Sequence, residues 1–227
     1  MKIAVLTGAG ISAESGIKTF RDSDGLWEGH DVMEVASPQG WKADPANVLH
    51  FYNLRRRQLL EVEPNPAHFA LTKLQEHFDV QIVTQNVDNL HEKAGNKNVL
   101  HLHGELLKVR SEFDENMVYT WEKDVKIGDK AEDGHQLRPD IVWFGEAVPK
   151  IEEAAQIFNE CDVAIIIGTS LQVYPAAGLI DFAPNHAQVY LIDPKPNVEP
   201  NRNLHVYAEN AVVATQKVVQ KIISNHA

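Results

Sequence analysis

Five short runs of apolar, mostly β-branched residues place the strongest constraint on how this chain can fold. Longer amphipathic stretches separate them, so strand-like and helix-like patterns alternate along the sequence. Such runs are typical of strands buried on both faces, and the alternation indicates a parallel sheet with helices packed against it. We therefore expect an α/β fold with strands at 2–7, 80–84, 99–103, 163–167 and 189–192.

One region breaks this alternation. This break spans 111–138. The strand-like runs 106–113 and 117–121 flank the polar turn 114–116, which predicts a hairpin. An exposed loop at 126–136 leads to a further strand-like run at 140–144. The amphipathic stretches outside this region predict helices at 45–62, 66–76, 151–160 and 211–224.

Charge and cysteine content narrow the class of protein. The 227 residues include 32 acidic and 21 basic side chains, and the net charge of -11 argues against direct nucleic-acid binding. The single cysteine, Cys161, excludes an intramolecular disulfide and a multi-cysteine metal cage. No run approaches the roughly 20 apolar residues of a membrane span, and the N-terminus lacks a signal-peptide layout. We expect a cytoplasmic monomer that does not contact membranes.

Two glycine-containing turns at strand ends suggest a dinucleotide site. Gly8-Ala9-Gly10-Ile11-Ser12-Ala13 follows the first strand, where glycines allow a tight turn and a following helix start favours a pyrophosphate. Gly168-Thr169-Ser170 follows the most hydrophobic strand. Asp193 ends the next strand, where its carboxylate can accept hydrogen bonds from ribose hydroxyls. A simple turn explains the glycines as well, and Asp193 before Pro194 is equally explained as a turn residue.

Six motifs in register carry a resemblance to a known family. They are Gly8-Ala9-Gly10-Ile11-Ser12, Gly16-Ile17-Lys18-Thr19-Phe20-Arg21, Thr84-Gln85-Asn86-Val87-Asp88, His101-Leu102-His103-Gly104, Trp143-Phe144-Gly145-Glu146 and Gly168-Thr169-Ser170. In this order and spacing they resemble the sirtuins over nearly the whole chain. The resemblance implies a Rossmann-like core at 1–29, 66–104 and 139–227, with a small inserted subdomain at 30–65 and 105–138.

The resemblance also implies that NAD is consumed as a co-substrate. Residues of the glycine turns and of the following motifs would bind it: Gly8, Ala9, Gly10 and Ser12 at the phosphates, Arg21 at the cofactor loop, Phe20 over the nicotinamide side, Gln85, Asn86 and Asp88 at the nicotinamide carboxamide and its ribose, and Gly168, Thr169, Ser170 and Asp193 along the adenosine half. His103 would be the general base, because a histidine with a pKa near neutrality can take a proton from a ribose hydroxyl. His101 faces the same side of the predicted strand, so it stays open as an alternative.

Two further groups of residues would bind the acyl-lysine substrate. Val142, Phe144, Gly145 and Glu146 resemble the stretch that pairs with an extended peptide, although a buried aromatic strand end explains Trp143 and Phe144 equally well. Tyr52 and Arg55 lie three apart, on one face of a predicted helix, and together suit a carboxylate. An arginine-rich helix face is also commonly just solvated. The pair looks like the one in sirtuins that remove succinyl, malonyl or glutaryl groups.

The chain departs from the family at its zinc site. Most sirtuins carry two Cys-x-x-Cys pairs between the catalytic histidine and the Phe-Gly-Glu stretch. Here Ser111 stands where the first cysteine is expected, and His135 is the only soft ligand nearby. We expect no zinc, and a hairpin module packed by its own side chains: Phe113, Met117, Val118, Tyr119 and Trp121.

The resulting prediction is an NAD-dependent protein-lysine deacylase that acts on acyl-lysine proteins or peptides and releases nicotinamide and O-acyl-ADP-ribose. A mono-ADP-ribosyltransferase, a non-catalytic NAD or ADP-ribose sensor and an ordinary dehydrogenase are the alternatives. His103 and the Tyr52/Arg55 pair argue against the transferase. A dehydrogenase does not explain the Gln85-Asn86-Val87-Asp88 block.

Overall fold

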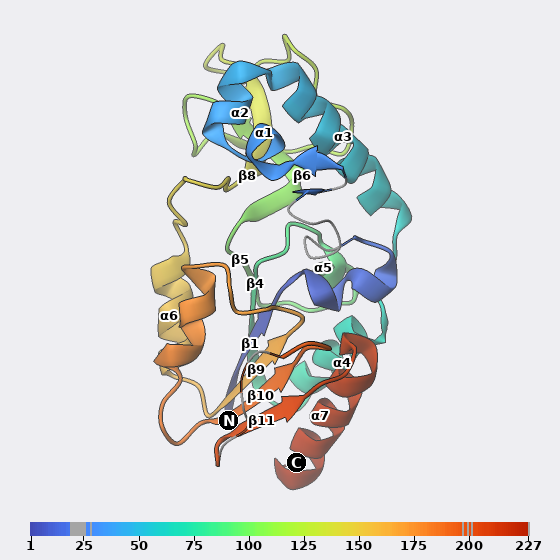
Figure 1. Cartoon of the computed structure of the whole chain (residues 1–227), viewed down its shortest axis with the longest axis vertical. Helices are drawn as coiled ribbons and strands as arrows, with labels where there is room; N and C mark the ends of the chain where they lie inside the picture. Colours follow the sequence, from blue (N-terminus) through green and yellow to red (C-terminus); the bar gives the residue numbers. More distant parts are fainter. Residues whose placement is uncertain (19–25, 28, 197, 199, 201, 227) are drawn as a thin grey trace.

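The computed structural model describes residues 1–18, 26–27, 29–196, 198, 200 and 202–226, which form a large and a small lobe (Figure 1). The large lobe holds a six-stranded sheet in the order β11-β10-β9-β1-β4-β5, and every neighbouring pair in it is parallel. Its strands are β1 (Lys2–Thr7), β4 (Asp79–Thr84), β5 (Val99–His101), β9 (Val163–Ile167), β10 (Gln188–Ile192) and β11 (Leu204–Tyr207). The α/β prediction is confirmed.

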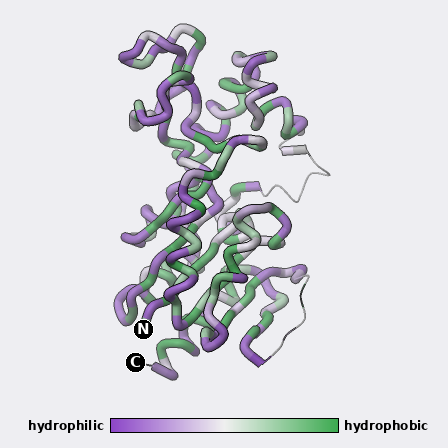
Figure 2. Tube along the Cα trace, turned by 90° about the vertical axis from the view of Figure 1, so that its left-hand side faces the viewer, coloured by the Kyte–Doolittle hydropathy of each residue, from purple (hydrophilic) through white to green (hydrophobic). Residues whose placement is uncertain are grey.

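Helices cover both faces of this sheet, as predicted. In β1, Ile3 and Val5 pack towards α4 (Pro66–Gln75) and α7 (Ala211–His226), whereas Ala4 and Leu6 pack towards α6 (Ile151–Asn159). Side chains of a strand alternate between faces, so a strand covered on both sides is apolar throughout. In Figure 2 hydrophobic segments run through the centre of this lobe. No helix in the described ranges is long and apolar enough to cross a membrane.

The small lobe joins helices to a three-stranded antiparallel sheet. Its helices are α1 (Val32–Val35), α2 (Pro38–Ala43) and α3 (Pro45–Glu61), and its sheet has the order β7-β6-β8, with β6 (Gly104–Ser111), β7 (Val118–Thr120) and β8 (Leu137–Ile141). A short pair, β2 (Leu26–Trp27) and β3 (His30–Asp31), lies beside them, and α5 (Leu90–Lys93) follows β4. The pairing of β6 with β7 confirms the predicted hairpin.

Two strand predictions are wrong in their limits. The strand expected at 140–144 lies at Leu137–Ile141, because β8 pairs with β6 over these residues and the chain turns from Trp143 to Glu146. The strand expected at 99–103 ends at His101. Leu102 and His103 therefore lie beyond the sheet, at the passage into the small lobe.

The predicted core of the hairpin module is also partly wrong. Phe113 is 77% exposed, and Val118 is exposed as well. Met117, Tyr119 and Trp121 do pack inward, but the buried centre consists of Leu49, Val109, Val125, Ala131 and Leu137. Leu49 comes from α3, so the module is stabilised by a neighbouring helix in addition to its own strands.

Candidate active site

The two glycine turns pack against each other at the carboxyl ends of β1 and β9. The amide of Gly10 donates a hydrogen bond to the carbonyl oxygen of Gly168 at 2.9 Å. A Cβ atom on Gly10 would lie 2.6 Å from Gly168 Cα, and one on Gly8 would lie 2.7 Å from Gly168 O. Gly168 itself has a φ of +63°, which favours glycine. These glycines are therefore required by the contact between the two turns, whatever ligand they also bind.

The helix start expected after Gly10 is not an α-helix. The chain forms two 3-10 turns, η1 (Ala9–Ile11) and η2 (Ala13–Ser15). The amides of Ile11 and Ser12 donate to the carbonyls of Gly8 and Ala9. The dipole of a long helix is consequently absent from residues 9–15, so the expected α-helix start, which would favour a phosphate, is wrong.

The Gln85-Asn86-Val87-Asp88 block joins the same turns after β4. Asn86 Nδ2 donates to Gly8 O at 3.2 Å and to Ser12 Oγ at 3.3 Å, and Ser12 Oγ donates to Asp88 Oδ2 at 2.9 Å. Gln85 Nε2 donates to Thr169 Oγ1 at 3.2 Å. Burial raises the pKa of Asp88, while its hydrogen bonds with Leu90 N and Ser12 oppose this rise. The predicted residues from three distant segments thus meet in one polar cluster.

His103 has the hydrogen bonding that a general base requires. Its Nδ1 lies 2.9 Å from the carbonyl oxygen of Gln85. A carbonyl only accepts hydrogen bonds, so Nδ1 carries the proton and Nε2 keeps its lone pair. No described residue bonds to Nε2. Burial lowers the pKa of His103 although the bond to Gln85 opposes this, so the ring is neutral at physiological pH.

His101 has the opposite character. Its Nδ1 lies 3.0 Å from Asn86 O and its Nε2 lies 2.8 Å from Glu92 Oε1, so both nitrogens face acceptors. Burial opposes protonation, but the hydrogen bond and charge of Glu92 outweigh it and raise the pKa of His101. An imidazolium held between two acceptors has no lone pair with which to take a proton. The geometry therefore favours His103 over His101 as the base.

A buried chain of hydroxyls and imidazoles beneath the site was not foreseen. Thr7 Oγ1 donates to Thr84 Oγ1 at 2.8 Å, and Thr84 Oγ1 also accepts from Asn86 N at 3.0 Å. His91 Nε2 lies 3.0 Å from Thr7 Oγ1, and the His91 ring meets that of His68 at a centroid distance of 5.0 Å. Single threonines within apolar strands carry no distinctive pattern, so only the fold reveals this support.

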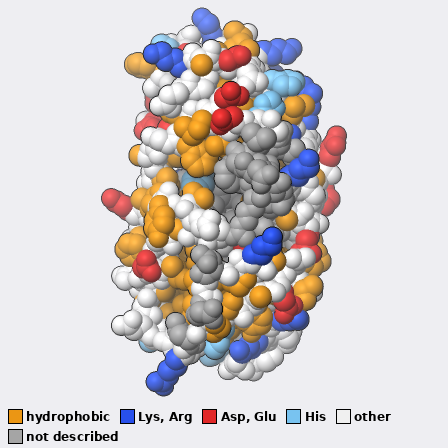
Figure 3. Space-filling view, viewed as in Figure 1, with side chains coloured by type: hydrophobic (Ala, Val, Ile, Leu, Met, Phe, Trp, Pro, Cys, Tyr) orange, Lys and Arg blue, Asp and Glu red, His pale blue; other side chains and the backbone are white. Residues whose placement is uncertain are grey.

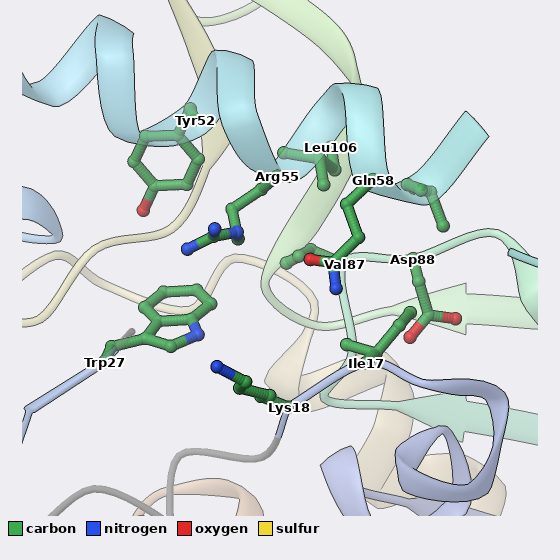
Figure 4. A pocket seen from close by; sticks show the side chains of 10 residues that line it. Ile17, Lys18, Trp27, Tyr52, Arg55, Gln58, Val87, Asp88 and Leu106 are labelled. Atoms are coloured by element: carbon green, nitrogen blue, oxygen red, sulfur yellow. The ribbon is translucent and has the colours of Figure 1, made fainter. Parts of the chain in front are cut away.

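A pocket opens between the lobes, below α3 (Figure 4). Arg55 points from α3 towards Trp27, with the Tyr52 ring beside it and Lys18 across the space (Figure 4). Tyr52 and Arg55 therefore both line this pocket, on the one helix face that their spacing predicts. Hydrophobic side chains border the junction of the lobes on the face shown in Figure 3. The pocket lining, of which sequence reasoning identified only Tyr52, Arg55 and Asp88, is Ile17, Lys18, Trp27, Tyr52, Arg55, Gln58, Leu59, Val87, Asp88 and Leu106.

The 142–146 stretch lies between His103 and the small lobe. The amide of Val142 donates to His103 O at 3.0 Å, and the amide of Phe144 donates to Ala36 O at 3.0 Å. Gly145 has a φ of +90° at the turn. The Glu146 carboxylate accepts from the amide of Trp143 at 2.7 Å, so this side chain stabilises the turn. Trp143 is buried and Phe144 is exposed, so the buried-aromatic interpretation holds for Trp143 alone.

Of the remaining predicted residues, Asp193 and Ser170 lie in turns, and two others fall outside the described residues. Asp193 is buried, and its carboxylate accepts from Lys195 N at 2.8 Å, which is the turn role. Ser170 follows Gly168 and Thr169 in a partly buried turn. Phe20 and Arg21, expected at the cofactor, lie outside the described residues.

Ser111 closes the hairpin at the position of the expected cysteine. Its Oγ donates to Asp133 Oδ2 at 2.6 Å and accepts from the amides of Phe113 and Asp114. His135 stacks on Phe113 at a centroid distance of 4.7 Å. Within the described ranges no three histidine, cysteine or carboxylate side chains are grouped so as to hold a metal.

Comparison with known proteins places this geometry in a family. Residues 8–175 match the model of the Sir2 family. The chain belongs to the Sir2 family. Two relatives of this sirtuin, from Helicobacter pylori (strain ATCC 700392 / 26695) and Bacteroides thetaiotaomicron, are named NAD-dependent protein deacylase. They are 61% identical over 222 residues and 54% identical over 228 residues, with 97% of each chain covered in both comparisons.

Solved sirtuin structures share the whole fold. A Sir2 homologue in complex with NAD superimposes with a TM-score of 0.89 at 35% identity, covering 100% of this chain and 91% of that one. A Sir2 protein bound to an acetylated peptide gives a TM-score of 0.82 at 28% identity, covering 97% of this chain and 92% of that one. The predicted sirtuin family and its NAD-binding fold are thereby confirmed.

Proposed function

We propose that this sirtuin is an NAD-dependent protein-lysine deacylase with a preference for acidic acyl groups. The observation that carries the catalytic part is the neutral His103 held by Gln85 O beside the Asn86, Ser12 and Asp88 cluster. The names of the two bacterial relatives and the NAD complex of the structural neighbour support the same activity.

The residues present fit NAD. The glycine turns leave no room for side chains at the ends of β1 and β9, and the amide and carboxylate groups of Asn86 and Asp88 converge there. NAD supplies the ADP-ribosyl group that accepts the acyl chain, with nicotinamide as the leaving group. His103 Nε2 takes a proton from a ribose hydroxyl, because its lone pair is available while Nδ1 is tied to Gln85 O. The Glu92 carboxylate favours the protonated form of His101, whose Nδ1 donates to the Asn86 carbonyl.

The acidic-acyl preference rests on the pocket beneath α3. Arg55 and Tyr52 both line it, and Arg55 Cζ lies 5.0 Å above the Phe51 ring, which orients the guanidinium. A guanidinium offers two parallel donors to a carboxylate, and a partly enclosed site strengthens that contact relative to water. Lys18 adds a second positive charge at the pocket. We therefore propose succinyl-lysine and malonyl-lysine, beside acetyl-lysine, as substrates.

We further propose that folding and activity need no zinc. The Ser111 hydrogen bonds to Asp133 and to two backbone amides connect the hairpin at the place where thiolates would otherwise bind a metal. Asn53 of α3 adds a second tie, since it donates to Val125 O at 2.8 Å and accepts from Val125 N at 2.9 Å.

The test identifies the reaction products formed by the wild type and by one variant, His103→Ala. The protein is incubated with NAD and acetyl-, succinyl- or malonyl-lysine peptides, and products are identified by mass spectrometry beside His103→Ala. We expect nicotinamide release and deacylation that His103→Ala abolishes. NAD binding without nicotinamide release would identify a sensor. Protein that carries ADP-ribose would identify a transferase, and formation of NADH would identify a dehydrogenase.

Arg55→Met tests the acyl preference, and Arg57→Met on the same helix is its control because Arg57 pairs with Asp124 outside the pocket. Arg55→Met should reduce succinyl-lysine hydrolysis far more than acetyl-lysine hydrolysis. Equal losses on both substrates would remove the pocket assignment while leaving the deacylase activity intact.

A further inference from the structure

Tyr52, the phenol in the acyl pocket, is held by a partner that lies outside the pocket lining. Trp143 Nε1 donates a hydrogen bond to Tyr52 Oη at 3.0 Å, and the ring centroids lie 6.4 Å apart. Both side chains are buried, with 0% of Tyr52 and 2% of Trp143 exposed. Water therefore does not compete for this bond.

The direction of this hydrogen bond determines where the phenol proton goes. An indole N–H can only donate, so Tyr52 Oη is the acceptor and its own proton must find a different partner. No described residue accepts that proton. Burial raises the pKa of Tyr52, which favours the protonated phenol. A buried donor without an acceptor is unfavourable until an acceptor arrives, and the pocket is where one can arrive.

The orientation of Trp143 is itself fixed by an ion pair. Arg138 Cζ lies 3.3 Å from the centroid of the Trp143 ring, and Arg138 Nη1 donates to Glu146 Oε1 at 2.9 Å. Glu146 also accepts from the backbone amide of Trp143. Backbone and ring are thus held from two sides, which leaves the indole N–H aimed at Tyr52.

We infer that Trp143 is a positioning residue for acyl recognition, which directs the hydroxyl proton of Tyr52 towards the carboxylate of an acidic acyl group. The inference rests on the proposed acidic-acyl preference. An acetyl group has no carboxylate to accept the proton, so the effect of Trp143 should be confined to acidic substrates. This distinguishes positioning from a general structural role, which would affect both substrates equally.

The experiment measures kcat/KM for succinyl-lysine and acetyl-lysine peptides and compares their ratio. Trp143→Phe removes the N–H and keeps an aromatic ring over Arg138. The loss of one neutral hydrogen bond should lower the succinyl-to-acetyl ratio about fivefold. Tyr52→Phe should lower it similarly, and Tyr52→Phe combined with Trp143→Phe should lower it no further, because both changes remove the same contact.

Trp41→Phe is the matched control. Its ring lies 5.8 Å from that of Trp143, but its N–H donates to Glu112, so the ratio should stay at the wild-type value. Thermal melting of each variant checks that the protein is folded. The ratio then compares two substrates on the same folded protein. Additive losses in the double variant, or an unchanged ratio in Trp143→Phe when Arg55→Met lowers it, would overturn the inference alone. An unchanged ratio in Arg55→Met would overturn the acidic-acyl preference and this inference with it.

Discussion

His68 should make the stability of this sirtuin depend on pH between pH 6.5 and about pH 4. Its side chain is fully buried against His91 at the start of α4, and its Nδ1 accepts from Asn65 N at 3.3 Å. Burial lowers the pKa of His68 to about 4, with the hydrogen bond from Asn65 opposing that shift. The unfolded chain therefore binds a proton at a pH where the folded protein does not.

The sign and size follow from this difference. A histidine with a depressed pKa stabilises the fold above its unfolded pKa of about 6.5, and this contribution is lost as the pH falls towards the folded value. The gap of about 2.5 pH units corresponds to roughly 3 kcal/mol in full. Between pH 7 and pH 5 the loss should reach about 2 kcal/mol. His101, whose pKa is raised, works in the opposite direction in every variant and cancels in the comparison.

The assay is urea unfolding at pH 7 and pH 5, followed by circular dichroism. His68→Gln is the variant, because glutamine at the third helical position can still accept from Asn65 N but cannot titrate. The wild type should lose about 2 kcal/mol more than His68→Gln over this range. His77→Gln changes an exposed histidine of the same region and should follow the wild type. Equal losses in wild type and His68→Gln would show that His68 is not the source of this pH dependence.

Three further outcomes are expected at the active site and the hairpin. Because burial lowers the pKa of His103 and the base must be neutral, kcat/KM should hold down to pH 6.5 and fall only below it; an acid limb above that value would contradict the assignment. Gly10→Ala should raise KM for NAD at least tenfold, since its Cβ would lie 2.6 Å from Gly168 Cα. Gly178→Ala, whose Cβ would come no nearer than 3.7 Å to its neighbour, should keep the wild-type KM for NAD in the same assay. Dialysis against a chelator should leave the melting temperature unchanged, and stoichiometric zinc in the purified protein would disprove metal independence.

The large lobe could be predicted because burial on both faces leaves a plain signature. Every residue of β9 is buried, so the run stands out as uninterrupted apolar sequence. β11 escaped prediction for the converse reason. It lies at the edge of the sheet, all four of its residues are only partly buried, and its sequence Leu-His-Val-Tyr mixes polar and apolar side chains. An edge strand has a neighbouring strand on one side only, so its side chains are covered less completely and need not be apolar throughout.

Sequence reasoning named part of the candidate site, but not the contacts that hold those residues in place. The glycines were expected to admit a pyrophosphate, yet Gly10 and Gly168 are required first by the contact of one turn with the other. Similarly, Glu146 was expected at the substrate, while its carboxylate bonds to Trp143 N and Arg138. A motif identifies which residues are needed. It does not distinguish a residue that touches a ligand from one that holds its neighbour.

The pocket lined by Tyr52 and Arg55 shows how a residue that the sequence does not reveal can affect function. Tyr52 and Arg55 lie three residues apart, so helical periodicity alone places them on one face. Trp143 is separated from Tyr52 by 91 positions, and it reaches the phenol only because α3 packs over the turn that follows β8. Arg55 would supply the charge and Tyr52 the hydroxyl. Trp143, which the sequence pattern does not reveal, would orient that hydroxyl. Acyl preference in this sirtuin should therefore vary with changes in the turn at Trp143 even when Tyr52 and Arg55 are kept.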